Sequence, residues 1–163
     1  MKFSSILFVF TLFGCLQSHA ANVCVSNMAD FEKRKEQIPP MLQKLPVMFT
    51  VDSFAVTAGL KISPAGEKMQ LEANVNAIGS GDDYQQVTYI KEVCIIDNKV
   101  TMKLEAGANN RKEPPPTISL IDSKSVKINS ITFNKATESQ FRSISRKVSS
   151  DLGGSSSGAG GVK

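Results

Sequence analysis

The sequence has little of what most hydrolytic enzymes use for catalysis. Among its 163 residues there are one histidine, three cysteines and no tryptophan. The only histidine, His19, lies in an N-terminal segment that we expect to be removed. Catalytic sites of the Ser-His-Asp or Cys-His type need a histidine that acts as a base near neutral pH. We therefore predict a protein that is not an enzyme and has no catalytic residues.

Motifs for nucleotides, cofactors and metals are also missing. The sequence has no P-loop, no G-x-G-x-x-G and no S-x-x-K arrangement. Structural zinc needs four ligands, and calcium takes six to eight oxygens, more than the loop around Asp82 and Asp83 offers. The pattern Gly154-x-Ser156-x-Gly158 matches the nucleophile-elbow motif in sequence only. It lies in a Gly/Ser-rich tail, without the strand before it and the helix after it that the motif requires. We expect no cofactor and no metal.

Charge and aromatic content are modest. The chain has 19 basic and 15 acidic residues, and 7% of its residues are aromatic, which disfavours binding to nucleic acid. Arg142, Arg146 and Lys147 lie close together near the C-terminus and form a candidate patch for an anionic partner. The alternative is that these cations only complement the dipole at the end of a helix.

The first twenty residues have the order of a secretory signal peptide. Lys2 precedes the uncharged apolar run Ile6–Phe13, and small residues flank His19. The run is too short to span a bilayer, which takes about 20 apolar residues. We expect cleavage between Ala20 and Ala21, and a periplasmic or secreted mature protein.

A second processing route remains open. Leu12-Phe13-Gly14-Cys15 resembles a bacterial lipobox, although Phe13 is bulky where a small residue is usual. Acylation of Cys15 would make the protein an envelope-anchored lipoprotein with a structural role. Only in that case do we expect contact with a membrane.

Two cysteines remain after either route, Cys24 and Cys94. In an oxidising compartment an even pair indicates a disulfide. We expect this bond to tie the start of the first helix to a central strand. In the loop-entropy model it contributes on the order of 4 kcal/mol to stability.

The remaining sequence predicts one α+β domain over residues 21–150, after the signal at 1–20 and before a flexible tail at 151–163. Caps and apolar spacing predict helices from about Asn27 to Gln37 and after Thr137, where Thr137-x-x-Gln140 is a capping box. The alternation of apolar residues predicts one long strand from Phe49 to Ile62. In this strand Phe54 lies on the same face as the apolar residues that follow it. A slip in phase near its middle suggests a bulge. The other predicted strands are Met69–Ala77, Tyr84–Ile96, Val100–Ala106, Thr117–Ile121 and Val126–Phe133.

These elements predict a single twisted, mainly antiparallel sheet of about six strands, with an N-terminal and a C-terminal helix packed on it. A long curved sheet with small inward residues can seat a helix or an apolar ligand. The predicted function is that of an exported, non-enzymatic domain that binds a partner protein or an apolar small molecule. The envelope lipoprotein is the alternative, and a hydrolase that uses paired carboxylates is the third hypothesis.

Overall fold

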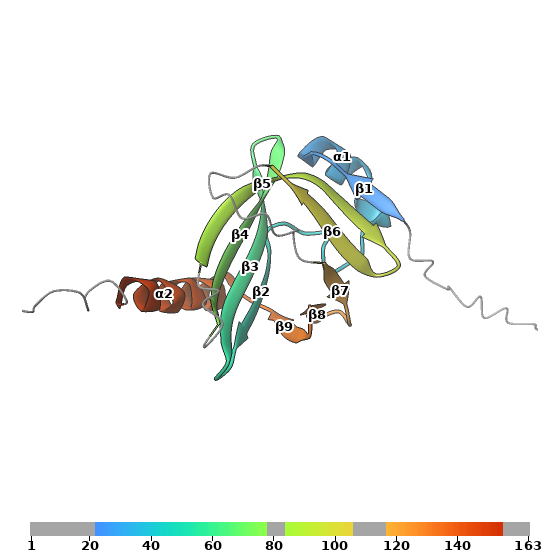
Figure 1. Cartoon of the computed structure of the whole chain (residues 1–163). Helices are drawn as coiled ribbons and strands as arrows, with labels where there is room; N and C mark the ends of the chain where they lie inside the picture. The colour runs from blue at the N-terminus through green and yellow to red at the C-terminus, as the bar shows by residue number, and fades with distance from the viewer. Residues whose placement is uncertain (1–21, 78–83, 106–116, 155–163) are drawn as a thin grey trace, which may run out of the picture.

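A computed structural model describes residues 22–77, 84–105 and 117–154. Within these ranges the chain forms nine strands and one long helix (Figure 1). The helices are α1 (Met28–Lys33), the short 3-10 helix η1 (Lys35–Gln37) and α2 (Glu138–Gly154). The strands are β1 (Val23–Val25), β2 (Val47–Asp52), β3 (Val56–Ala65), β4 (Lys68–Ala77), β5 (Tyr84–Ile96), β6 (Lys99–Leu104), β7 (Ile118–Leu120), β8 (Ser125–Ile128) and β9 (Ile131–Lys135).

The sheet closes on itself as a barrel of eight antiparallel strands. The strand order is β1-β5-β4-β3-β2-β9-β8-β7-β6, and β6 pairs back onto β5. Strand β1 is a ninth strand, added to β5 outside the closed circle. The predicted antiparallel pairing is confirmed. The prediction of a single twisted sheet of about six strands with two packed helices is wrong.

Closure depends on the length and bend of β5. This strand has 13 residues and pairs with β4 over Tyr84–Ile90, and with β6 from Ile90 onward. Its register shifts between Ile90 and Glu92, and a bulge of this kind bends a strand and increases its twist. On the far side of the circle β9 pairs with β2 through Thr50 and Asn134, which completes the barrel.

Two predicted strands are in fact hairpins. The strand expected from Phe49 to Ile62 is divided into β2 and β3, and the slip in phase is the turn between them. The strand expected from Val126 to Phe133 is divided into β8 and β9 at Asn129, whose φ is +55°. The first predicted helix is also divided, into α1 and η1. Neither turn contains the Asn-Gly or Pro-Gly pairs that mark hairpins in a sequence.

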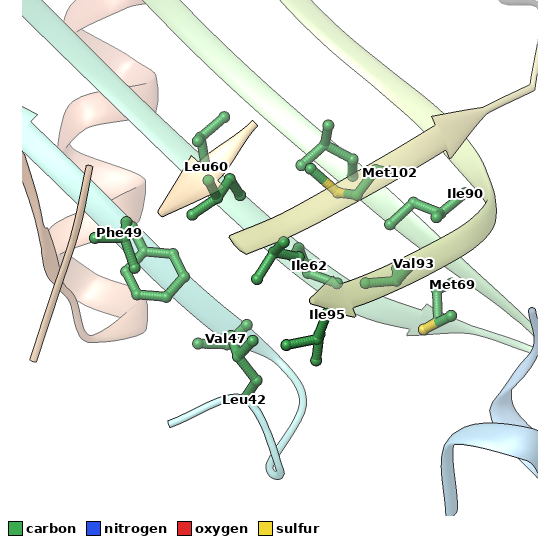
Figure 2. Close-up of a cluster of buried hydrophobic side chains, with 14 of the residues drawn as sticks. Leu42, Val47, Phe49, Leu60, Ile62, Met69, Ile90, Val93, Ile95 and Met102 are labelled. Atoms are coloured by element: carbon green, nitrogen blue, oxygen red, sulfur yellow. The ribbon is translucent and has the colours of Figure 1, made fainter. Parts of the chain in front are cut away.

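Apolar side chains fill the barrel. Figure 2 shows the centre of this core, where residues from β2 to β6 point toward one another. Phe49, Met69 and Ile90 are at most 1% exposed. An eight-stranded barrel is just wide enough for its own side chains to fill it. The labelled core residues are Leu42, Val47, Phe49, Leu60, Ile62, Met69, Ile90, Val93, Ile95 and Met102.

Helix α2 lies against the outer surface of the barrel (Figure 1). It contacts β2, β3, β4 and β5, and it buries Phe141, Ile144 and Val148. The predicted capping box is confirmed, because the Thr137 amide donates to Gln140 Oε1 (2.8 Å) and the Gln140 amide donates to Thr137 Oγ1 (3.3 Å). A second, smaller apolar layer thus lies between helix and barrel.

Candidate functional site

Within the residues that the structure describes, the two ends of the barrel differ in what covers them. Because neighbouring strands alternate in direction, the β3–β4, β5–β6 and β7–β8 turns lie at one end. The segment from α1 to β2 lies at this end too, since the Met28 amide donates to the carbonyl of Glu67 in the β3–β4 turn (2.9 Å). It buries Phe31, Ile38 and Leu42 against the barrel core. We call this the capped end.

The far end carries the β2–β3 and β8–β9 hairpins and a set of apolar side chains that are only partly buried. These side chains point inward from residues at or near the strand ends on this side of the barrel, and they pack on the core. We call this set the rim. It consists of Val51, Val56, Val75, Tyr84, Leu104 and Ile131.

A cavity lies toward the capped end, and it is small. It is lined by apolar side chains that include Phe31, Leu42, Met69 and Ile95, and its volume is about 20 Å³. That is close to the space of one water molecule, whereas pockets for small molecules measure about 300–1,000 Å³. This cavity therefore offers no room for an apolar ligand.

The β2–β3 hairpin presents an aromatic side chain at the far end. Phe54 lies at its tip and is 92% exposed. The tip is held by Ser53, whose amide and hydroxyl both donate to the carbonyl of Val56 (2.9 and 3.0 Å). The Val56 amide in turn donates to Ser53 Oγ (3.1 Å). Phe54 is thus a large, exposed apolar group on a turn that is held by hydrogen bonds.

Asp52 fixes the base of this hairpin to helix α2. Its Oδ1 accepts hydrogen bonds from Lys147 Nζ (2.7 Å) and from Thr57 Oγ1 (2.8 Å). These bonds, the one from Lys147 first, lower the pKa of Asp52 below its ordinary value of 3.8. The Phe54 turn is therefore connected to the C-terminal half of α2 through one carboxylate.

This connection predicts a small, acid-sensitive contribution to stability. A carboxyl whose pKa is depressed by folding stabilises the fold above its unfolded pKa, and that contribution is lost as the pH falls below about 4. We expect Asp52→Asn to lower the melting temperature slightly at pH 6 and to have no effect near pH 2. The pair is half exposed, so the difference corresponds to well under about 1 kcal/mol. Thermal melts of both proteins across this range test it, and an equal difference at every pH would contradict it.

The predicted basic patch is present on α2, with part of its charge already paired. Arg142 Nε lies 3.0 Å from Glu138 Oε1, and Lys147 is paired with Asp52. Arg146 Nε donates to the carbonyl of Arg142 (3.4 Å). The three cations therefore lie on one helix, but two of them have acidic partners within the chain. The patch stays a prediction as a site for an anionic partner.

The disulfide between Cys24 and Cys94 is present. The two residues are directly opposite each other in the β1–β5 pair, and their Cα atoms are 4.0 Å apart. The bond therefore joins two paired strands, and not a helix to a strand as expected. Glu92 lies beside it, with a carboxylate oxygen and both Sγ atoms all within 4.8 Å of one another. The bond is compatible with an oxidising, exported environment.

Several predicted positions lie outside the described residues. They are the signal peptide with its cleavage site at Ala20 and Ala21, the possible lipidation site Cys15, and the loop with Asp82 and Asp83. Of the predicted tail, residues 151–154 belong to α2 and the rest lies outside as well. These assignments remain predictions. Among the described helices, none is both long and apolar enough to cross a membrane.

Two residues of interest were not singled out from the sequence. The alternating pattern placed Phe54 inside a continuous strand, and the turn that exposes it carries no strong sequence signal. Glu92 had a usable signal, because it is two residues before Cys94 and alternate residues of a strand share a face.

Comparison with known proteins gives no relative to argue from. No family model, no curated protein and no solved structure matches this chain. Function must therefore be inferred from the chain's own chemistry.

Proposed function

We propose that this is an exported β-barrel domain that acts by binding a partner protein, with Phe54 and the adjoining rim as the contact surface. The observation that carries the proposal is the 92% exposure of Phe54 on a turn held by hydrogen bonds. Binding hot spots are enriched in aromatic side chains, and an ordered turn loses little entropy when it docks.

A protein partner is favoured over a small apolar ligand. The barrel centre is packed with its own side chains, and the cavity near its capped end holds about 20 Å³. A ligand of drug or lipid size would have to displace core residues such as Met69 or Ile90, which are 1% exposed. A partner's apolar side chain could instead pack on Phe54 without any change in the barrel.

Three acidic residues with shifted pKa values are poor candidates for the general acid of a hydrolase. A general acid needs a raised pKa, and the carboxyl groups of Asp52, Asp122 and Glu138 have lowered ones. For Asp52 and Glu138 the first cause is a hydrogen bond from Lys147 and Arg142, and for Asp122 it is one from the backbone of Lys124. Groups of this kind stabilise turns and helix contacts.

The proposal is tested by photocrosslinking in the cells that produce the protein. Phe54 is replaced by p-benzoylphenylalanine, and in a matched control Ile121 is replaced in the same way. Ile121 is 52% exposed and lies at the capped end, beside the β7–β8 turn. We expect one discrete protein adduct from position 54 and none of that mass from position 121.

Competition makes the result specific. An excess of unmodified protein should suppress the adduct at position 54, whereas the Phe54→Ser variant should not. Identical adduct patterns from both positions, or equal suppression by both competitors, would contradict the proposal. A co-purified small molecule in native mass spectrometry would favour the apolar-ligand hypothesis in its place.

Export is the other part of the proposal, and the intact mass of the secreted protein tests it. We expect a chain that begins at Ala21, carries no acyl group and gains two mass units when it is reduced. A chain that begins at an acylated Cys15 would support the lipoprotein alternative. A full-length chain found uncut in the cytosol with free thiols would exclude export altogether.

A further inference from the structure

We propose that Cys24, Cys94 and Glu92 form a binding site for a thiophilic metal cation such as Zn²⁺ or Cd²⁺ when the disulfide is reduced. The site lies on the outer face of the β1–β5 pair. It is separate from the proposed contact surface at Phe54 and does not depend on it.

The strand register brings the three ligands together. Cys24 and Cys94 face each other across the β1–β5 pair, and Glu92 is on the same face of β5 because it is two residues from Cys94. Both Sγ atoms and a Glu92 carboxylate oxygen lie within 4.8 Å of one another, and all three residues are partly buried. The two Sγ atoms are bonded to each other in the oxidised chain, so the three ligand atoms can occupy three corners of a tetrahedral site once that bond is reduced.

The arrangement does not depend on the sulfur–sulfur bond alone. Val23 pairs with Ile95 and Val25 pairs with Val93, and both β1 valines are 2% exposed. These contacts hold β1 on β5 after reduction, so the two sulfur atoms stay opposite each other. Thiolates bound to one zinc ion at about 2.3 Å lie roughly 3.7 Å apart, which a small side-chain rotation provides.

The ligand set selects the class of metal. Two thiolates favour soft and borderline cations over Mg²⁺ or Ca²⁺, and a carboxylate completes a three-ligand site with one position for water. Lys103, the present ion-pair partner of Glu92, is 74% exposed and can turn into solvent. We therefore expect an accessible, exchangeable site and not a closed structural one.

Loading requires a reductant, which we take to be a dithiol. The dithiol gives two electrons to the Cys24–Cys94 bond and becomes a disulfide, while both cysteines become thiols. The metal then replaces the thiol protons, which pass to solvent, so binding becomes tighter as the pH rises. In the reverse step the disulfide form of that dithiol takes two electrons back from the Cys24 and Cys94 thiolates, which re-forms their bond and releases the ion.

A titration with Cd²⁺ tests the site. The mature chain is first reduced with dithiothreitol, and the reductant is then removed under anaerobic conditions. Cd²⁺ is added stepwise, and the thiolate-to-metal charge-transfer absorption in the ultraviolet is recorded. We expect one Cd²⁺ per reduced chain, the same absorption when Cd²⁺ displaces Zn²⁺ that was bound first, and no such absorption from the oxidised chain. Near-ultraviolet circular dichroism shows in the same samples whether the barrel is intact.

Variants separate the three ligands. Cys24→Ser should abolish the absorption, and Glu92→Gln should weaken Cd²⁺ binding by roughly tenfold or more. Glu105→Gln is the matched control, because Glu105 pairs with Lys68 elsewhere on the barrel. The affinity of this variant for Cd²⁺ should equal that of the parent. The proposal is overturned if the reduced chain takes up no Cd²⁺, if Glu92→Gln binds as tightly as the parent, or if reduction alone unfolds the barrel.

Discussion

Replacing both Cys24 and Cys94 by serine is expected to lower the free energy of unfolding by about 4 kcal/mol. The two cysteines are 70 residues apart in sequence, so their bond closes a long loop and greatly restricts the unfolded chain. Changing both residues avoids a stray thiol. Urea denaturation of the oxidised parent and the double-serine variant measures the difference. The midpoint should fall and the slope should rise, because the unfolded chain without the cross-link exposes more surface.

Reductant provides the control for this prediction. Dithiothreitol should lower the stability of the parent toward that of the double-serine variant and leave the variant itself unchanged. A difference of less than about 1 kcal/mol between the two proteins would contradict the loop-entropy argument. A loss of the expected size would mean that the fold reaches its full stability only in an oxidising compartment.

Local patterns in the sequence predicted individual strands well. The strict alternation over Met69–Ala77 corresponds to β4, and the long strand predicted over Tyr84–Ile96 corresponds to β5. Asp97 and Asn98 form the tight turn between β5 and β6, with φ angles of +49° and +60°. Each of these features depends on neighbours within a few residues, which is the range over which side-chain alternation carries information.

Closure of the barrel could not be predicted in the same way. Alternation shows which face of a strand is buried, but it does not show which strand each edge pairs with. The contact between Thr50 and Asn134 joins segments far apart in the chain, and β5 pairs with different strands along its two edges. An open sheet and a closed barrel therefore have nearly the same local pattern.

The candidate surfaces show the same limit. The basic residues of α2 were identified from their spacing, but the pairing of Lys147 with Asp52 depends on how the helix docks. Phe54 was placed on a strand, since a three-residue turn without glycine or proline resembles a bulge in sequence. No metal was expected from the sequence, because structural zinc needs four ligands and two cysteines supply only two. The third ligand, Glu92, becomes apparent once β1 pairs with β5.

Truncating Phe141 is expected to destabilise the protein by about 3–5 kcal/mol, the usual range for a buried Phe→Ala change. Its ring is 2% exposed and packs on the outer face of β3, where Gly59 lets the helix approach closely. Losing the ring leaves a cavity between helix and barrel that the rigid sheet cannot fill. Urea denaturation of Phe141→Ala measures the loss in the free energy of unfolding. Arg146→Ala, on the exposed face of α2, is the control and should change this free energy little.

A double-mutant cycle with Gly59→Ala shows whether the close approach is the cause. An added Cβ at Gly59 would lie 3.0 Å from Cε2 of Phe141 and 3.3 Å from Cγ2 of Ile144. Gly59→Ala should therefore destabilise the parent, because one of these side chains must move. In the Phe141→Ala background the same methyl group enters vacated space, so its cost should disappear or reverse. Equal effects of Gly59→Ala in both backgrounds would mean that Phe141 and Gly59 are not energetically coupled.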